Sequence, residues 1–438
     1  MARYLNGVNV PHRKKTRHLP VLRMEPPKTV TIPMAMHIGR PATPIVKVGD
    51  LVQVGTKIGE ADGFVSVPVY ASVSGKVTKI IELLDAHGKK DPAVVIESDG
   101  AMTPADTIAP PVVNSREDLI DAIRTSGMVG LGGAGFPTHV KFSVDPERVE
   151  YLVINGAECE PYVTSDTITM VERADDMARG INAMAEYMGI RNVIIGVENN
   201  KKTAIRVMKE MAASITSCAV RVQSLPSVYP QGGEKVLVYH TTGRKIPVGK
   251  LPIDVGCIVI NCTTLASIGA YLQTGMPLVE KCVTVEGKAV RQPQNVLAPV
   301  GTSMADLFEV CGGLTEEPDK LIYGGPMMGI TVPDASAPIM TNSNAILALT
   351  KKEAWLPKTT ACIRCSACTN HCPFGLAPAA ISRAYDRKDT EALKMLAVDA
   401  CMECGCCSFV CPANRPLVQK NKLGKELLRE EKAKESGK

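Results

Sequence analysis

The chain has 438 residues, of which 45% are hydrophobic, 22% charged and 4% aromatic, and its formal net charge is +5. This length exceeds what one hydrophobic core can organise, so we expect two to four domains. The small net charge does not favour a protein that binds nucleic acid.

No apolar run reaches the length of a membrane span. The nearest, "VGCIVINCTTLASIGAYL", carries Asn261, Thr263 and Thr264 and is typical of a core strand followed by a helix. The start "MARYLNGVNVPHRKK" lacks the apolar region of a secretory signal. Fifteen cysteines without such a signal indicate metal or redox chemistry in a reducing compartment rather than disulfides.

Two charged segments flank the chain. The stretch "RKKTR" at residues 13–17 is expected to be a solvated arm, and the tail from residue 420 is expected to be a frayed terminal helix.

Residues 28–100 show the period-two alternation of short strands, with glycine turns at Gly49, Gly55 and Gly75. This pattern resembles the barrel-sandwich hybrid fold of lipoyl and biotinyl carriers. Such carriers present a lysine at a hairpin tip, but "SVPVYASVSG" holds none before Lys76. We therefore expect a covering or docking module rather than a covalent carrier.

The string "GLGGAGFPTHVKF", residues 130–142, contains the G-x-G-x-x-G pattern of dinucleotide-binding turns. The preceding "SREDLIDAIRTSG" predicts a helix that is capped by Ser115 and ends at Gly127. The next convincing strand is "VEYLVING", residues 149–156. A Rossmann turn follows a strand and opens a helix, and a P-loop needs G-K-[ST]. The order helix, glycine loop, short helix, strand fits neither.

Nine of the fifteen cysteines lie between residues 362 and 411, in two runs with the spacing C-x2-C-x2-C-x3-C-P. In two-cluster ferredoxins the fourth cysteine of such a run ligates the other cluster. The spacing therefore predicts two [4Fe–4S] clusters. One set of ligands is Cys362, Cys365, Cys368 and Cys411, and the other is Cys401, Cys404, Cys407 and Cys372.

Zinc is the alternative, but zinc sites use two pairs of ligands rather than a triplet with a remote fourth cysteine.

Cys406 is not needed as a ligand and is expected beside the second cluster. Between the runs the pattern predicts helices, with Asp389 or Thr390 as a cap. The outlying cysteines are expected to be buried small apolar residues: Cys159, Cys218, Cys257, Cys262, Cys282 and Cys311.

The glycine string, followed by "YLVINGAECEP", resembles the flavin-binding, NADH-oxidising subunit of respiratory complex I. The resemblance implies a Rossmann-like domain that binds FMN and NADH. It implies that the backbone N–H groups of Gly130, Gly132 and Gly133 cradle the FMN phosphate and the edge of the ring.

The same resemblance assigns Lys141, Asn155 and Glu158 to the flavin ring and its ribityl chain. It places Glu160 near the nicotinamide and Phe136 beside the entering NADH. Glu160 and Lys141 are therefore the candidate catalytic residues.

Two further segments extend this resemblance. "YPQGGEKVL" keeps a flavin-site acid as Glu234, and "INCTTLASI" places Asn261 and Thr264 at the FMN phosphate. Three positions depart from the family, since Leu131 replaces an arginine, Ala157 an aspartate and Gly233 a glutamate. The glycines and the lysine remain, so the flavin assignment stands.

Residues 282–330 resemble the β-grasp, soluble-ligand-binding module that accompanies the flavin domain in complex I, and we expect this module to pack between flavin and clusters. Within it "GGPMMG" is expected to be a packed turn rather than a methionine ligand site. Residues 331–345 are predicted to be a polar connector.

The order of the modules resembles the C subunits of Rnf complexes, the ion-pumping ferredoxin:NAD+ oxidoreductases of bacteria. The expected fold is multidomain α/β: a barrel-sandwich hybrid, a Rossmann-like FMN and NADH domain, a β-grasp module, and a helical two-cluster ferredoxin domain. The predicted limits are residues 1–110, 111–275, 276–335 and 336–438.

The resemblance implies a peripheral subunit on the cytoplasmic face of the bacterial membrane, with no span of its own, which moves electrons between NAD(H), FMN, two [4Fe–4S] clusters and partner subunits. Two alternatives stay open. One is a soluble cobalamin reductase of a bacterial microcompartment. The other is a non-catalytic relay or scaffold subunit, for which the losses at Ala157 and Gly233 are the support.

Overall fold

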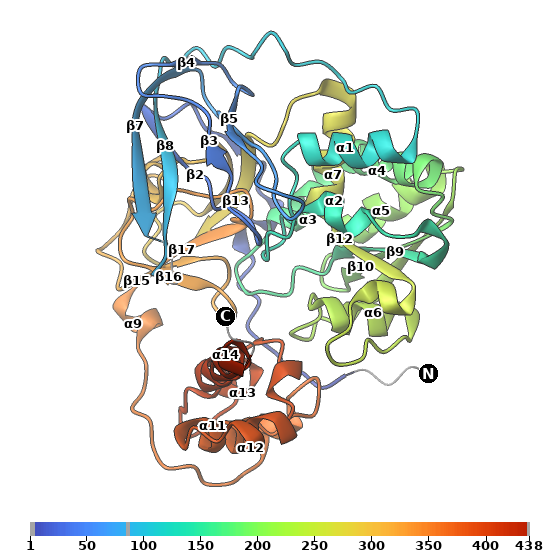
Figure 1. The fold of residues 1–438 in the computed structure, drawn as a ribbon. Helices are drawn as coiled ribbons and strands as arrows, with labels where there is room; N and C mark the ends of the chain where they lie inside the picture. The colour runs from blue at the N-terminus through green and yellow to red at the C-terminus, as the bar shows by residue number, and fades with distance from the viewer. Residues whose placement is uncertain (1–4, 85–87, 436–438) are drawn as a thin grey trace.

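A computed structural model describes residues 5–84 and 88–435. Figure 1 shows a β-module at the upper left, an α/β domain at the right, a mixed β-sheet between and below them, and a helical module at the bottom. The helical module joins the rest through an extended segment after α9 (Lys351–Ala354). The expected multidomain α/β class is therefore correct.

The β-module consists of two small antiparallel sheets with a shared apolar core. The sheet orders are β2-β8-β7-β4 and β3-β5-β6, and inward side chains such as Ile32 and Ile96 are fully buried. The turn predicted at Gly75 requires glycine, since its φ is +151° and a Cβ would lie 2.0 Å from the carbonyl oxygen of Glu97. The strands are β2 Thr29–Pro33, β3 Thr43–Pro44, β4 Leu51–Val52, β5 Lys57–Glu60, β6 Val69–Tyr70, β7 Gly75–Leu84 and β8 Lys90–Ser98.

The α/β domain is a parallel sheet, in the order β11-β10-β9-β12, with helices on both faces. Along β9, Leu152 and Ile154 enter the large core with α4, α5 and α7. Val153 enters a smaller core with α6, as expected for a strand buried on both faces. The elements are β9 Tyr151–Gly156, α3 Ser165–Glu172, α4 Ala174–Tyr187, β10 Asn192–Glu198, α5 Lys202–Ser214, β11 Ala219–Leu225, α6 Glu234–Thr242, β12 Cys257–Asn261 and α7 Cys262–Thr274.

The segment before this sheet has the predicted order. Helix α1 (Arg116–Thr125) is capped by Ser115, whose Oγ accepts the Asp118 N–H at 3.1 Å, and the chain turns at Gly127 with a φ of +71°. The glycine loop and the short helix α2 (Thr138–Phe142) then lead to β9.

The mixed sheet has six strands in the order β1-β14-β13-β17-β15-β16, and two of them lie outside the predicted limits 276–335. β1 (Leu22–Arg23) pairs with β14, and β17 (Ala345–Leu349) lies between β13 and β15. Because β17 is buried along its whole length, the boundary predicted after residue 335 cuts through the sheet. The remaining elements are β13 Glu280–Glu286, β14 Gln294–Pro299, α8 Met304–Val310, β15 Lys320–Tyr323 and β16 Ile330–Val332.

The helical module surrounds the two cysteine runs. Asp389 caps α12 by accepting the Ala392 N–H at 2.9 Å, as predicted. The tail is not frayed over the described residues, because Leu428 and Gly424 of α14 pack against Leu393 and Val398. The helices are α10 Ala367–Asn370, α11 Pro378–Asp386, α12 Thr390–Met395, α13 Cys406–Phe409 and α14 Leu417–Glu435. None of the helices in the described part of the chain combines the length and the hydrophobicity of a membrane span.

The N-terminal segment corrects two expectations. It is not a solvated arm, because the Lys14 side chain is only 3% exposed and Thr16 is fully buried. It also lies outside the β-module expected for residues 1–110. Val8 instead forms a bridge with Tyr229 of the α/β domain, and Figure 1 shows this segment passing between the modules.

Candidate functional site

The carboxyl ends of β9 and β12 bring the candidate ligand residues together. The chain runs from β9 outward to β10 and β11 and then returns to the other side of β9 as β12. In an open parallel sheet such a reversal leaves a crevice at the carboxyl ends of the strands, where ligands bind. Asn155 near the end of β9 and Asn261 at the end of β12 are direct partners in the sheet register.

The glycine-rich loop folds on itself beside this crevice. The Gly130 N–H donates to the Phe136 carbonyl at 2.9 Å, and the Gly135 N–H donates to the Gly130 carbonyl at 3.2 Å. The Leu131 N–H donates to Thr264 Oγ1 at 2.9 Å, which fixes the loop to the first turn of α7. The ring of Phe136 is half-buried at the end of the loop.

The tip of the loop has the shape of a cradle that a side chain would fill. A Cβ on Gly132 would lie 2.8 Å from Asn261 Nδ2, so a side chain there would push the loop away from β12. Gly133 has a φ of +141° and open space on its Cβ side. Both residues are exposed, and successive backbone N–H groups of this kind bind anions. The cradle fits a phosphate, whereas Gly130 has no close neighbour that demands glycine.

Asn261 and Thr264, predicted to contact the phosphate, use their side chains within the protein. Asn261 Oδ1 accepts the N–H groups of Thr263 and Thr264 at 2.9 and 3.2 Å, and its Nδ2 donates to Asp166 Oδ2 at 2.8 Å. The Thr264 hydroxyl accepts a hydrogen bond from the Leu131 N–H. These side chains therefore shape the loop and the amino end of α7, whose dipole favours anions.

Asn155 and Lys141 connect the strand ends to neighbouring loops. Asn155 Nδ2 donates to the Gly232 carbonyl at 2.9 Å. Lys141 Nζ donates to the Val259 carbonyl at 3.0 Å and lies 3.4 Å from Glu234 Oε1. Val259 is in the middle of β12 and Glu234 begins α6, so the Lys141 ammonium lies between these two elements, and its half-exposed pair with Glu234 leaves it accessible.

Glu158, predicted to contact the flavin, uses its carboxylate within the protein. Its Oε1 accepts the N–H of Asp166 at 2.7 Å and of Thr167 at 3.3 Å, and Oε2 accepts the Thr167 hydroxyl. The carboxylate thus satisfies the amino end of α3, where unpaired N–H groups and the helix dipole favour a negative charge. Desolvation raises the pKa of Glu158, and the nearby charges of Lys14 and Lys201 oppose this shift.

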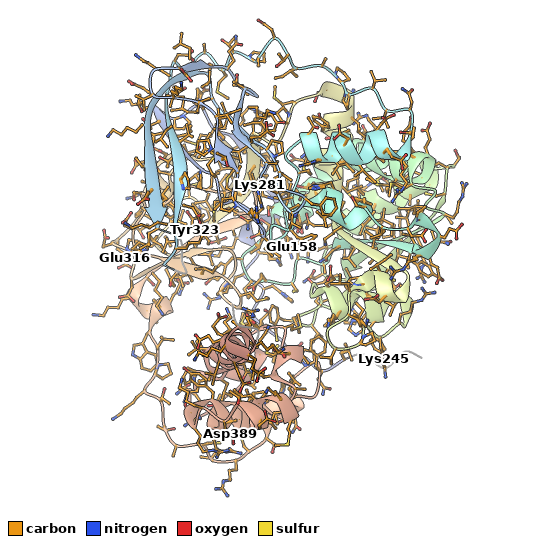
Figure 2. All side chains as sticks on the ribbon, in the orientation of Figure 1. Glu158, Lys245, Lys281, Glu316, Tyr323 and Asp389 are labelled. Atoms are coloured by element: carbon orange, nitrogen blue, oxygen red, sulfur yellow. The ribbon has the colours of Figure 1, made fainter. Side chains whose placement is uncertain are left out.

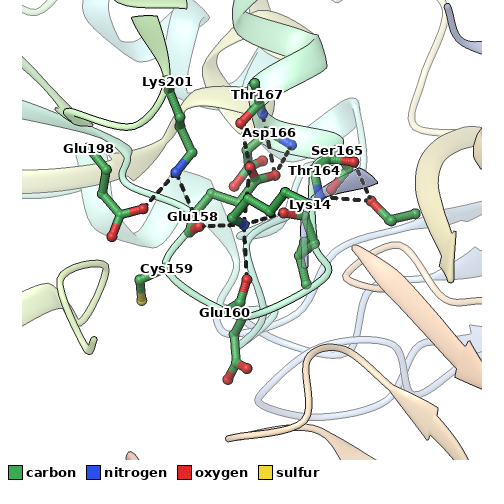
Figure 3. Close-up of polar contacts among 12 residues, drawn as sticks. Lys14, Glu158, Cys159, Glu160, Thr164, Ser165, Asp166, Thr167, Glu198 and Lys201 are labelled. Carbon is green, nitrogen blue, oxygen red and sulfur yellow. Dashed lines mark hydrogen bonds and ion pairs between the residues drawn. The ribbon is translucent and has the colours of Figure 1, made fainter. Parts of the chain in front are cut away.

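Two buried lysines that sequence reasoning missed hold the loop after β9 (Figure 3). Lys14 Nζ donates to the carbonyls of Glu158 and Glu160, both at 2.9 Å, and to that of Val163. Lys201 Nζ donates to the Ala157 carbonyl at 2.6 Å and pairs with Glu198 Oε2 at 2.6 Å. No local pattern marks either lysine.

Glu160 points to the mixed sheet, at the turn "GGPMMG". Its carboxylate accepts the N–H groups of Met327 at 3.0 Å and Met328 at 2.8 Å. A Cβ on Gly325 would lie 2.2 Å from Glu160 Oε2, so this glycine makes the contact possible. Desolvation raises the pKa of Glu160 to about 7, although both N–H donors act in the opposite direction. The turn is packed as expected, and its backbone N–H groups bind the Glu160 carboxylate.

Tyr229 connects the α/β domain to the second cysteine run. Its hydroxyl donates to the Cys404 carbonyl at 2.7 Å, and Cys406 Sγ lies 3.9 Å from the Tyr229 carbonyl. A Cβ on Gly233 would lie 2.2 Å from Met402 Cε, so the same loop packs tightly on the helical module. Cys406 is therefore a contact residue beside the second run.

The two cysteine sets predicted from the crossed ferredoxin pattern line two separate cavities. The first has a volume of about 520 Å³, and Cys362 and Cys365 on its rim are exposed. The second is small, about 20 Å³, and lies deeper. The first cavity is lined by Cys362, Cys365, Cys368 and Cys411, and the second by Cys372, Cys401, Cys404 and Cys407 together with the spare Cys406.

This donor set suits iron–sulfur clusters, since each cavity is lined by the four cysteines of one crossed set, and Cys406 adds a fifth cysteine to the second cavity. Over the described residues, no three cysteine, histidine or acidic side chains converge closely enough to hold one metal ion. The first cavity suits an iron–sulfur cluster by both its volume and its cysteine donors. The second suits one by its cysteine donors alone. Of the outlying cysteines, Cys257, Cys262 and Cys311 are buried as expected, and the other three are half-buried.

Four family models match the chain in order. They are the RnfC barrel sandwich hybrid domain at residues 2–101, the Nuo51 FMN-binding domain at 123–270, the SLBB domain at 282–331 and a 4Fe-4S dicluster domain at 358–415. The crystal structure of a NAD+-reducing [NiFe]-hydrogenase in the air-oxidized state shares the fold, with a TM-score of 0.51 and 16% identity. The match covers 73% of this chain and 62% of that one, so this chain spans about three fifths of the hydrogenase chain.

Several curated relatives match over most of their length. The C subunit of the Na+-translocating ferredoxin:NAD+ oxidoreductase complex of Acetobacterium woodii is 41% identical over 88% of this chain and 87% of its own. The C subunit of the proton-translocating complex of Clostridium ljungdahlii is 40% identical over 86% and 83%. The C subunit of the ion-translocating oxidoreductase complex of Rhodobacter capsulatus is 36% identical over 96% and 82%. The chain therefore belongs to the RnfC family, the C subunits of ion-translocating oxidoreductase complexes.

Proposed function

We propose that this chain exchanges a hydride between NAD(H) and FMN, and single electrons between FMN and two [4Fe–4S] clusters, within an ion-translocating ferredoxin:NAD+ oxidoreductase complex. The observation that carries the proposal is the shared loop at residues 229–233. This loop accepts a hydrogen bond from Asn155 of the crevice and donates one from Tyr229 to the second cysteine run. The proposed two-electron site and the proposed one-electron carriers would thereby be connected within one chain.

Each proposed group has its own set of residues. The N–H groups of the exposed residues Gly132 and Gly133 and the amino end of α7 would hold the FMN phosphate, with Lys141 beside the ring. The two crossed cysteine sets would hold the clusters. When bound, FMN interconverts hydride and single-electron transfer, and the clusters accept one electron each.

Glu160 and Lys141 are the proposed catalytic residues, and their environments support different roles. The Lys141 ammonium remains accessible between β12 and α6, where it can attract an anionic nucleotide or reduced ring. The Glu160 carboxyl has a pKa of about 7, so it can hold or release a proton at neutral pH.

The assembly follows from the relatives. Their names describe subunits of translocating complexes, and we infer that this chain binds partner subunits of such a complex at the cytoplasmic face of the membrane. It would serve there as a peripheral electron carrier.

The test is anaerobic reconstitution of the full chain followed by titration with NADH. We expect one FMN and about eight iron atoms per chain, as two four-iron clusters require, and we expect NADH to bleach both the flavin and the cluster absorbance. Clusters that respond to dithionite but never to NADH would overturn the proposed function. A protein that reconstitutes its clusters but takes up no flavin would do so as well, and would favour the relay alternative.

A further inference from the structure

Lys281 is a buried cation beneath the glycine loop, and it comes from a different module. It lies on β13 of the mixed sheet, where its neighbours in the strand pair with β14 and β17. The residue is only 2% exposed, and Figure 2 shows it at the junction of the mixed sheet and the α/β domain. Its Nζ donates to the carbonyl of Leu131 at 3.2 Å.

Leu131 is consequently held on both sides. Its N–H donates to Thr264 Oγ1, and its carbonyl accepts from Lys281. In a planar trans peptide the carbonyl and the following N–H point in opposite directions. With the Leu131 carbonyl turned to Lys281, the N–H of Gly132 points away from the buried lysine, on the exposed side of the loop.

The charge of Lys281 is only partly compensated within the protein. An ammonium has three donors, and the Leu131 carbonyl is the one acceptor that the described residues give it within hydrogen-bonding distance. Burial lowers the pKa of Lys281, while the carboxylate of Asp166 opposes that shift. Asp166 is itself bound by Asn261 and Thr263. A buried cation with spare donors is stabilised by an anion bound nearby.

We propose that Lys281 is a positioning residue that turns the glycine loop toward a phosphate, so that the site discriminates the phosphorylated flavin FMN from riboflavin. This inference rests on the proposed function. It makes the mixed sheet a contributor to the flavin site of the α/β domain. Methionine at this position would keep the volume but would release the Leu131 carbonyl and remove the charge.

The experiment compares FMN and riboflavin binding to flavin-free full-length protein by quenching of flavin fluorescence. In Lys281→Met we expect FMN affinity to fall roughly tenfold or more, the usual loss for a hydrogen bond to a charged group, with riboflavin affinity unchanged. Lys281→Arg should retain most of the FMN preference. Lys288→Met, in the exposed turn after the same strand, is the matched control and should bind like the wild type.

Thr264→Val provides a second route, because it releases the other side of Leu131 without removing a charge. It too should weaken FMN more than riboflavin. Equal weakening of both flavins in Lys281→Met would mean a merely structural lysine and would overturn the inference, as would unchanged FMN binding. Wild-type protein that binds neither flavin would instead overturn the proposed function, and this inference with it.

Discussion

Lys14 shows how one side chain can organise a functional loop from far away in sequence. Its ammonium donates hydrogen bonds to three backbone carbonyls within residues 158–163 and lies 3.8 Å from Glu158 Oε2. Burial alone disfavours the charged lysine and lowers its pKa. The carbonyls and the carboxylate compensate this cost, so the N-terminal segment and the loop stabilise each other.

Replacing Lys14 should therefore destabilise the folded protein. We expect Lys14→Met to lower the free energy of unfolding by about 3–5 kcal/mol, because Glu158 loses a partner for its buried charge. Lys15→Met, at the adjacent exposed position, should change it by less than about 0.5 kcal/mol. Urea unfolding followed by circular dichroism measures both. Equal stability of the two variants would show that the buried contacts of Lys14 carry no net stabilisation.

The double variant Lys14→Met, Glu158→Gln checks the cause. Because it leaves no unpaired buried charge, it should recover part of the stability lost in Lys14→Met. A purely additive result would assign the loss to packing instead.

Glu160 provides a pH dependence with a defined sign. Its pKa of about 7 in the folded protein exceeds the unfolded value of 4.5, so the folded state binds more protons between these values. Stability from this group is present at low pH and is lost as the pH rises from 4.5 through 7. The full shift corresponds to about 3 kcal/mol at most.

The matched measurement compares the wild type with Glu160→Gln by thermal unfolding between pH 5.5 and 7.5. The wild type should lose stability relative to the glutamine variant as the pH rises. Glu286 has a similarly raised pKa of about 7 from burial, but it is present in both proteins and cancels. A stability difference that stays constant with pH would contradict the assigned environment of Glu160.

At the level of elements, the two cysteine runs occupy different electrostatic surroundings. The cavity of the first run is lined by Arg364, Arg383 and Arg415 and by no carboxylate. The residues lining the second include no charged side chain, and Lys425, which contacts the Cys401 carbonyl, is paired with Glu403. Nearby positive charge stabilises a more reduced, more negative cluster and raises its potential.

Replacing all three arginines with glutamine should lower the potential of the first cluster selectively. Each arginine lies near the surface, and at about 0.5 kcal/mol apiece the sum approaches a tenfold change in the reduced fraction, or about 60 mV for one electron. Redox titration followed by electron paramagnetic resonance separates the two clusters. The second potential should stay constant, and high salt should shrink the shift at the first. Equal shifts at both clusters would contradict the assignment.

Elements that depend on neighbouring residues could be predicted from the sequence, and elements that depend on contacts with distant segments could not. The cap at Ser115, the cap at Asp389 and the two cysteine sets depend on residues within a few positions or on a fixed spacing. By contrast, β17 follows the polar connector predicted at residues 331–345 and falls within the limits predicted for the ferredoxin domain, and only its neighbours β13 and β15 place it in the mixed sheet. A short apolar strand that is buried between two others lacks the alternation of apolar and polar residues by which a strand is predicted from sequence.

The same limit applies to the internal contacts of the candidate site residues. Family resemblance assigns Glu158 to the flavin, but its carboxylate pairs with Lys14 of the N-terminal segment, a distant contact that local sequence does not predict. Lys281 gave no local signal, since a lysine in a strand is usually exposed. The crevice itself was foreseeable, because four segments in family order pointed to it.

At the scale of the whole molecule, the helical module is held by a few contacts and one exposed connection. Residues 355–366 are largely exposed, and the contacts of Tyr229 with Cys404 and Cys406 bridge the junction. The side chain of Tyr229 is only 1% exposed and packs with Val8 of the N-terminal segment. The junction therefore depends on this buried aromatic anchor more than on the connection.

This arrangement makes a two-part prediction. Limited trypsin digestion should cleave after the exposed Lys358, and the two wild-type fragments should still co-elute in gel filtration. In Tyr229→Ala the loss of a buried aromatic side chain costs about 3–5 kcal/mol, so the nicked fragments should separate. In the uncut variant NADH should then reduce the clusters more slowly, while dithionite still reduces them fully.

Tyr187→Ala is the matched control, because Tyr187 packs on the core of the α/β domain rather than on the helical module. It should leave the nicked fragments together and the rate of cluster reduction by NADH unchanged. If Tyr229→Ala fragments also stay together while that rate falls, the tyrosine acts on the electron path and not on docking. If neither property changes, the contact between crevice and clusters lies elsewhere, and the shared loop loses its place as the link between two-electron and one-electron chemistry.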